Sequence, residues 1–220
     1  MNIRKRNLAR TDKITKKTRR AFNKLASTYD TEEALQEPRK CYAPVMKIIK
    51  KRTNKELKLL DVGCGTGVML KSICREFPKA IEISGIDLSP AMVKKANSNL
   101  MGYKAHVIKG KIETVALPKE FYNVALCMHS FHHYPYPLKS LKRLCSTLCK
   151  NGMLIMADNY YEGWSRIKRN WELRIRDYPD GDMWMYSCFE LSVLTKLAGF
   201  QKQQCYRVGK KSFIFICQKK

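Results

Sequence analysis

The sequence predicts an α/β fold in which a mostly parallel, doubly wound sheet carries helices on both faces. Short apolar runs alternate with helical stretches through the central hundred residues, the pattern of repeated βαβ units. One such run contains Asp61 and leads into Gly63, Gly65 and Gly67, as expected where a strand turns tightly into a helix beside a ligand. The next run ends in Asp87, 24 residues after Gly63. An acid at this position typically binds ribose hydroxyls.

Each element of this fold has a local signal. The expected strands cover residues 58–62, 81–87, 105–108, 122–128 and 153–158. The expected helices cover residues 67–77, 90–97 and 137–148. Ser89-Pro90 predicts a helix start, with serine as the cap, and Asn151-Gly152 predicts the end of the helix before the fifth strand. A final helix over 187–198 and a hairpin of 200–208 and 212–218 complete the pattern.

The chain is expected to form a single domain over residues 1–220. Its predicted parts are an N-terminal helical cap (1–55), a ligand-binding core (56–158), a lid insertion (159–187) and a closing helix with hairpin (188–220). In the insertion, tryptophans and tyrosines interleave with arginines. This pattern indicates a lid over a substrate, or equally a surface helix whose aromatic stripe belongs to the core.

The glycine spacing narrows the class of ligand. A dinucleotide-binding loop needs its third glycine at position 68, which is Val68 here. No lysine followed by serine or threonine closes the loop, so a phosphate-binding P-loop is excluded. The predicted ligand is a nucleoside without phosphates.

Charge is the second unusual property of the chain. Lys and Arg number 43 against 19 Asp and Glu, a net charge of +24. Such a surface attracts RNA, DNA, anionic membranes or acidic substrates. The basic residues are dispersed and form no aromatic-rich RNA-binding module, so a solvated lysine-rich surface is the simpler interpretation and a polyanion or RNA contact the alternative.

The cysteines and the hydropathy indicate a cytoplasmic protein. Nine cysteines occur without a C-x-x-C pair, which favours reduced, mostly buried thiols over a disulfide or zinc framework. We expect no metal site. No apolar stretch approaches the roughly 20 residues of a membrane span, so we expect no span, and a monomer or dimer.

Four motifs together resemble a known family. They are Asp61-x-Gly63-x-Gly65-x-Gly67, the segment 85–92, Phe22-Asn23-x-x-Ala26-x-x-Tyr29-Asp30, and the segment 130–137. With them the chain closely resembles the Rossmann-like class I S-adenosylmethionine-dependent methyltransferases, and among these the methyltransferase domain type 11 group. The resemblance covers about nine tenths of the chain and implies a seven-stranded sheet with an antiparallel last strand.

The resemblance also implies a function. S-adenosylmethionine would be the cofactor, and its methyl group would pass to a small-molecule acceptor held in line with it. An RNA or protein methyltransferase, or a non-catalytic cofactor-binding protein, are the alternatives.

The resemblance further assigns residues to parts of the site. The methionine end of the cofactor would contact Tyr29, Asp61, Gly63, Cys64, Gly65, Gly67, Cys127 and Met128, the ribose Asp87, and the adenine Leu88, Met92, Lys111 and Ile112. His129, His132 and His133 are the candidate proton acceptors, and Tyr160 and Tyr161 the candidate acceptor contacts. Relatives usually carry aspartate where this chain has Lys111. Since lysine cannot accept a hydrogen bond from the adenine amino group, it is expected to weaken adenine binding.

Overall fold

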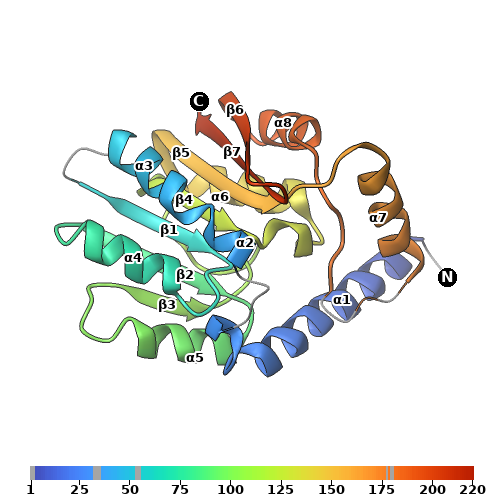
Figure 1. Cartoon of the computed structure of the whole chain (residues 1–220), viewed down its shortest axis with the longest axis horizontal. Helices are drawn as coiled ribbons and strands as arrows, with labels where there is room; N and C mark the ends of the chain where they lie inside the picture. Colours follow the sequence, from blue (N-terminus) through green and yellow to red (C-terminus); the bar gives the residue numbers. More distant parts are fainter. Residues whose placement is uncertain (1–2, 32–35, 53–55, 177, 179–180) are drawn as a thin grey trace.

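A computed structural model describes residues 3–31, 36–52, 56–176, 178 and 181–220. Its seven strands form one sheet in the order β3-β2-β1-β4-β5-β7-β6 (Figure 1). The strands are β1 (Lys58–Val62), β2 (Glu82–Asp87), β3 (His106–Lys109), β4 (Tyr122–Met128), β5 (Leu148–Asn159), β6 (Phe200–Val208) and β7 (Ser212–Lys219). Strand β7 pairs antiparallel with both of its neighbours, β5 and β6, and all the other strand pairs are parallel. The predicted fold class is confirmed, including the antiparallel last strand.

Helices cover both faces of the sheet. They are α1 (Ile3–Leu25), α2 (Gln36–Arg39), α3 (Tyr42–Arg52), α4 (Val68–Glu76), α5 (Pro90–Asn99), α6 (Pro137–Thr147), α7 (Gly163–Ile175) and α8 (Cys188–Leu197), with single 3₁₀ turns η1 (Tyr29–Thr31) and η3 (Phe131–His133). Apolar side chains of α3, α4 and α5 form the core on one face, and those of α6 and α8 form it on the other. None of the described helices combines the length and the apolar run that crossing a bilayer requires.

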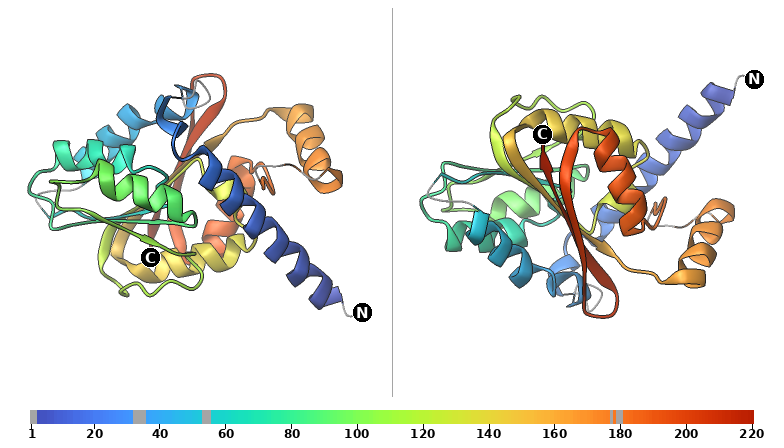
Figure 2. Two further views of the ribbon diagram at one scale, coloured as in Figure 1. Left: turned by 90° about the horizontal axis from the view of Figure 1, so that it is seen from below. Right: turned by 90° about the horizontal axis from the view of Figure 1, so that it is seen from above.

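The two central strands define the functional edge. Chain order reverses between β1, which continues to β2, and β4 on its other side. In open α/β sheets ligands bind outside the carboxyl ends of the strands at such a reversal. Helix α1 lies at this edge, and both α1 and α7 extend beyond the same side of the sheet (Figures 1 and 2). Lys17 Nζ on α1 donates to the carbonyl of Tyr178 at 2.7 Å, which ties the residue 159–187 insertion to α1.

One predicted boundary was wrong. Helix α6 ends at Thr147, and Asn151-Gly152 lies inside β5 rather than at the helix end. Along the β4–β5 ladder the pairs Tyr122↔Leu148 and Val124↔Met153 follow each other, so β5 holds three residues more than β4 there. Asn151 adopts φ 62° in this irregular stretch. The Asn-Gly pair therefore makes a local turn within a strand, a conformation that both residues tolerate.

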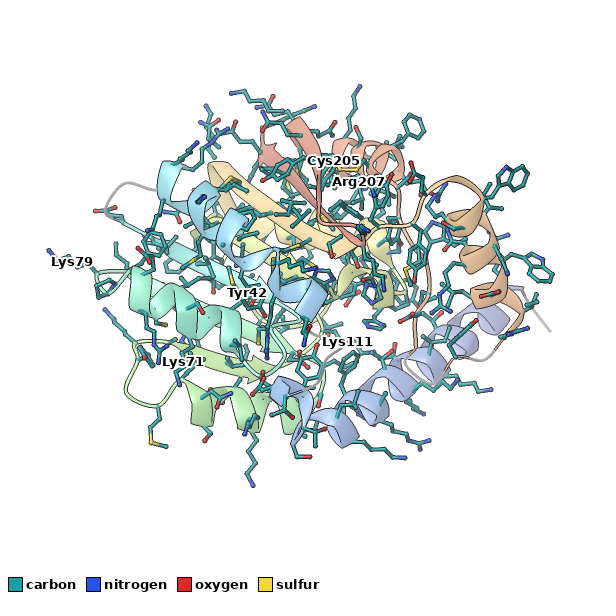
Figure 3. The ribbon with its side chains drawn as sticks, in the orientation of Figure 1. Tyr42, Lys71, Lys79, Lys111, Cys205 and Arg207 are labelled. Atoms are coloured by element: carbon teal, nitrogen blue, oxygen red, sulfur yellow. A yellow bond between two sulfur atoms is a disulfide. The ribbon has the colours of Figure 1, made fainter. Side chains whose placement is uncertain are left out.

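The expectation of wholly reduced cysteines was also wrong. Cys188, the first residue of α8, forms a disulfide with Cys205 in β6. Figure 3 labels Cys205. The other seven cysteines form no disulfide with a described residue, and all of them except Cys149 are buried. The pairing joins residues 17 apart in sequence, a spacing outside the short motifs that sequence inspection recognises.

The insertion has two parts with different surroundings. On α7 the rings of Trp164 and Trp171 are 84% and 60% exposed, so they do not belong to the core. The following stretch, residues 181–187, packs against η3 instead. Met185 is buried, and the Met183 amide donates to the His132 carbonyl at 2.9 Å.

Candidate functional site

The glycine turn after β1 has the geometry that its sequence predicts. Gly63, Gly65 and Gly67 have φ of 75°, 55° and 75°, the left-handed region that favours glycine. A Cβ on Gly63 would lie 2.5 Å from Ser130 Oγ, and one on Gly67 would lie 3.2 Å from Ala96 Cβ. The turn is therefore pressed against η3 at one end and against α5 at the other.

Asp87 closes the turn from the tip of β2. Its Oδ2 accepts from the Gly65 amide at 2.9 Å, and its Oδ1 accepts from the Ser89 amide at 2.8 Å. Burial raises the pKa of this carboxyl in spite of these bonds. Both oxygens are thus held in place by backbone donors, and the acid stands at the carboxyl edge as predicted.

Two adjoining cavities open at this edge. Asp87, Leu88, Lys111 and Ile112 line the first cavity, and Figure 3 shows Lys111 in the region between α2 and α1. Asp61 and Cys64 line the second cavity. The residues that line both are Tyr29, Gly63, Gly65, Met128 and His129. The structure therefore gathers the predicted ribose contact and three of the four predicted adenine contacts on one side, and the predicted methionine contacts Asp61 and Cys64 on the other.

Six predicted site residues lie elsewhere. The residues that are not among the described residues lining the two cavities are Gly67, Met92, Cys127, His132, Tyr160 and Tyr161. Met92 is fully buried beneath the Ser89 cap. Cys127 Sγ contacts Ser130 Oγ at 3.1 Å in the core. The Tyr160 ring is covered by the guanidinium of Arg207, whose Cζ is 4.2 Å from the ring centroid.

The carboxyl group of Asp61 needs a partner. Its side chain is buried, at 1% exposure, and Oδ1 has no hydrogen-bond partner among the described residues. Burial, with a smaller contribution from the charge of Asp87, raises its pKa to about 7. A cationic ligand group would stabilise the ionised carboxyl. This fits the ammonium of S-adenosylmethionine, and the glycine turn leaves open backbone beside it.

The three candidate proton acceptors have different environments. His129 follows β4 with φ 48°, and its amide donates to the Ala157 carbonyl at 2.7 Å. Neither of its ring nitrogens has a hydrogen-bond partner among the described residues, and burial lowers its pKa. His133 lines the first cavity. Burial and the neighbouring His132 lower the pKa of His133 to about 3.

His132 lies behind this wall rather than on it. Its Nδ1 is 2.5 Å from Asp158 Oδ1, with both side chains buried. Burial opposes a charge on the ring, but Asp158 and Asp182 raise the pKa of His132 above its ordinary value. It therefore forms a buried ion pair, and only His129 and His133 of the three candidates face the cavities.

Helix α1 supplies lining residues that sequence inspection missed. Thr15, Thr18, Arg19 and Phe22 all line the first cavity. They follow the i, i+3, i+4, i+7 spacing of one helical face. That spacing was the available signal, but the basic composition of the segment made it resemble a solvated surface.

Comparisons with known proteins agree with this geometry. A model of the methyltransferase domain matches residues 32–204. Over 139 residues the chain is 27% identical to malonyl-[acyl-carrier protein] O-methyltransferase of Priestia megaterium, covering 63% of this chain and 50% of that protein. Over 100 residues it is 33% identical to ubiquinone biosynthesis O-methyltransferase of Yersinia pestis, covering 44% and 40%. The chain thus spans about half the length, or less, of these curated relatives.

The fold is also shared with solved structures. A SAM-dependent methyltransferase from Aquifex aeolicus superposes with a TM-score of 0.68 at 22% identity, covering 89% of this chain and 97% of that one. The family model spans most of the chain, and the sheet has the seven strands and the antiparallel last strand implied by its motifs. The chain therefore belongs to the methyltransferase-domain family, with the fold of the class I S-adenosylmethionine-dependent methyltransferases.

Proposed function

We propose that this protein transfers a methyl group from S-adenosylmethionine to a small-molecule acceptor. The observation that carries the proposal is the placement of two acids around the glycine turn. Asp61 lines the second cavity, and its Oδ1 has no hydrogen-bond partner among the described residues. Asp87 lines the first cavity and is held by the Gly65 amide. Asp61 would take the ammonium of the cofactor and Asp87 its ribose hydroxyls.

The remaining cofactor contacts follow from the lining. Leu88 and Ile112 would hold the adenine, and Tyr29 would cover the methionine end. When bound, the cofactor supplies a methyl group already activated by its sulfonium charge. The work left to the protein is to exclude water, to orient the acceptor and, for a hydroxyl acceptor, to remove a proton. Positioning of this kind lowers barriers by on the order of 7–11 kcal/mol in favourable cases.

His129 is the favoured proton acceptor. It lines both cavities, so it lies where the cofactor and acceptor regions meet. Because burial lowers its pKa, the ring is neutral near pH 7, so one of its two nitrogens can accept a proton. Neither nitrogen has a hydrogen-bond partner among the described residues. Two relatives are named as O-methyltransferases, which favours an oxygen nucleophile.

The lining of the first cavity favours an anionic acceptor. Arg19, Lys111 and Lys139 reach this cavity from three different parts of the chain. Lys111 also offers an ammonium where an adenine-accepting carboxylate was expected. A carboxylate or phosphate on the acceptor would be stabilised by these cations.

The proposal is tested by activity screening with radiolabelled cofactor against a metabolite extract fractionated by charge. We expect label to enter acidic small molecules and to depend on Asp87, so an Asp87→Ala variant serves as the control. Calorimetry with S-adenosylmethionine is the companion measurement. No binding at millimolar cofactor would contradict the proposal as a whole.

An RNA or protein acceptor is the second candidate, because the net charge is +24. The same screen with RNA and protein fractions at low and high salt separates the two candidates. Label in RNA that disappears as salt rises would favour the second.

A further inference from the structure

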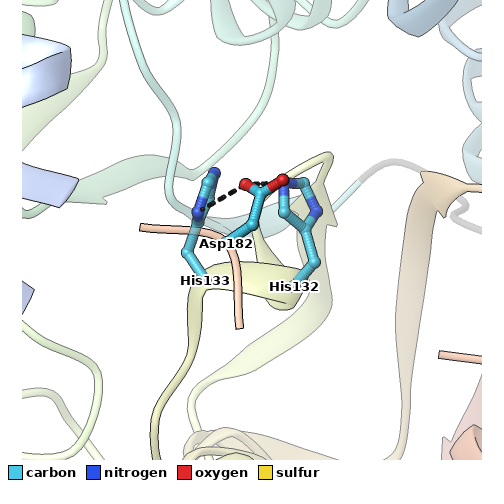
Figure 4. A group of neighbouring side chains, drawn as sticks. All are labelled: His132, His133 and Asp182. Carbon is cyan, nitrogen blue, oxygen red and sulfur yellow. Dashed lines mark ion pairs between the residues drawn. The ribbon is translucent and has the colours of Figure 1, made fainter. Parts of the chain in front are cut away.

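Two histidines and an acid form a cluster of neighbouring side chains (Figure 4), and one of them, His133, lines the first cavity. His132 and His133 come from η3, directly after β4, and Asp182 comes from the insertion. His132 Nε2 is 3.7 Å from Asp182 Oδ1, and His133 Nδ1 is 3.4 Å from the same oxygen. One potential ligand atom from each residue lies within 4.8 Å of the other two.

These distances match a shared metal ion better than direct hydrogen bonds. Hydrogen bonds between such groups are about 2.7–3.2 Å long. Atoms that ligate one tetrahedral ion at about 2.0–2.2 Å are roughly 3.3–3.6 Å apart. The three side chains are 7%, 9% and 12% exposed, and His133 Nδ1 has no hydrogen-bond partner among the described residues. A buried nitrogen of this kind requires a partner.

Neighbouring groups orient the cluster. Asp158 Oδ1 lies 2.5 Å from His132 Nδ1, which turns the other ring nitrogen of His132 toward Asp182. Arg169 Nη2 donates to Asp182 Oδ2 at 2.9 Å, which leaves Oδ1 to face both histidines. Metal-binding histidines are generally held by a carboxylate on their second nitrogen in this way.

We propose that His132 Nε2, His133 Nδ1 and Asp182 Oδ1 bind one divalent transition-metal ion, with Zn²⁺ as the first choice. On binding, the ion displaces the proton that His132 Nε2 carries in the ion pair with Asp158. Two imidazoles and one carboxylate suit Zn²⁺ and its first-row neighbours, whereas Mg²⁺ and Ca²⁺ prefer sites made of oxygen ligands. This proposal departs from the expectation, drawn from the sequence, of a chain without a metal site. The ligands come from segments far apart in sequence, and no short motif contains them.

The position of the ion suggests a use for it. His133 lines the first cavity, so the ion would lie at the wall where the acceptor is proposed to bind. Three protein ligands leave a coordination position open. This use rests on the proposed function: an acceptor hydroxyl at the open position would lose its proton more readily. The ion would also tie residues 181–187 to η3.

The test uses the full chain after treatment with a chelator and dialysis. Zn²⁺ is added, excess is removed, and retained metal is measured by mass spectrometry. We expect one Zn²⁺ per chain and a rise in melting temperature with Zn²⁺. Asp182→Asn and His133→Ala should each weaken binding at least tenfold. His106→Ala is the matched control, since His106 is largely exposed and lies outside the cluster, and it should bind as wild type does.

Spectroscopy identifies the ligands without relying on variants. Co²⁺ in place of Zn²⁺ should give a spectrum of nitrogen and oxygen ligands, and X-ray absorption at the zinc edge should show two imidazoles. A wild-type chain that retains no Zn²⁺, or a spectrum with sulfur ligands, overturns the metal site. A folded Asp182→Asn or His133→Ala variant that retains as much Zn²⁺ as wild type also overturns the metal site.

Calorimetry with S-adenosylmethionine on the same samples separates this proposal from the proposed function. Cofactor binding without zinc binding contradicts only the metal site. Zinc binding without cofactor binding contradicts only the methyl transfer.

Discussion

Replacement of Asp61 by asparagine should remove a pH dependence from cofactor binding. The Asp61 carboxyl is buried, and its pKa is raised from 3.8 to about 7 by burial and by the charge of Asp87. A difference of about three pH units favours the neutral form by about 4 kcal/mol. A cation bound beside the group favours the ionised form instead. Affinity for S-adenosylmethionine is therefore complete above pH 7 and is lost as the pH falls through 7.

The size of the effect follows from the ionised fraction. With a pKa of about 7, roughly half of the free protein is ionised at pH 7.0 and about 3% at pH 5.5. Wild-type affinity should therefore fall roughly 15-fold between these values. In Asp61→Asn the amide carries no charge in this range. That variant should bind more weakly and with a nearly flat profile.

Asp61→Asn should weaken cofactor binding but stabilise the folded chain at alkaline pH. Since the folded-state pKa of Asp61 lies above its unfolded value, the folded state holds the proton more tightly. The stability that this provides is complete below about pH 4 and is lost as the pH rises to about 7. Asp61→Asn should therefore melt at a higher temperature than wild type at pH 8, by an amount corresponding to at most about 4 kcal/mol.

Isothermal titration from pH 5.5 to 7.0 in two buffers of different ionisation enthalpy measures both the affinity and the protons released on binding. Wild type should release close to one proton near pH 6 and the variant close to none. Asp87 is unchanged in both proteins, so it serves as the internal control. A flat wild-type profile, or a variant that keeps the 15-fold dependence, would refute the assigned role of Asp61.

Three further predictions concern other parts of the chain. Gly63→Ala should lower the melting temperature and abolish cofactor binding in calorimetry, because a Cβ there meets a side-chain oxygen at 2.5 Å. Gly102 is the control, since it has a similar φ and open space around it. Gly102→Ala should lower the free energy of unfolding by only about 1–2 kcal/mol. Lys111→Asp should tighten cofactor binding several-fold in the same assay, since it restores an acceptor for the adenine amino group; unchanged or weaker binding would contradict this. Reduction of the Cys188–Cys205 disulfide should lower the free energy of unfolding in denaturant by about 3 kcal/mol, since the bridge spans 17 residues. The stability of a Cys188→Ala, Cys205→Ala double variant should not change on addition of reductant.

Local signals were sufficient to predict most of the sheet. The ranges 58–62 and 122–128 match β1 and β4, because a mostly apolar run of strand length is typical of a strand buried on both faces. Ser89 caps α5 as predicted, accepting from the Met92 amide at 3.1 Å. The start of β5 was not predictable in this way. Asn151-Gly152 is compatible with a helix end and with a strand irregularity, and pairing with β4 decides between them.

The candidate site likewise contains features that follow from local sequence and features that depend on long-range packing. The glycine turn and Asp87 are local features, since each is a short motif at a strand end, and both lie where they were expected. The α1 face and the disulfide depend on how distant segments pack. Their residues follow spacings that many surface helices and unpaired cysteines share. Met92 is the opposite case. The family motif predicts an adenine contact at this position, but the Met92 side chain is fully buried in the core.

The two acids around His132 show how far this dependence on packing extends. Asp158 ends an expected strand, so its place at the carboxyl edge follows from the sheet alone. Asp182 reaches the same histidine only because the insertion returns from α7 across η3, where the Met183 amide bonds to the His132 carbonyl. A substitution in the insertion, remote in sequence from the glycine turn, can therefore alter the cavity wall. We therefore expect substitutions in the insertion to change the choice of acceptor, as substitutions at the edge of the sheet would.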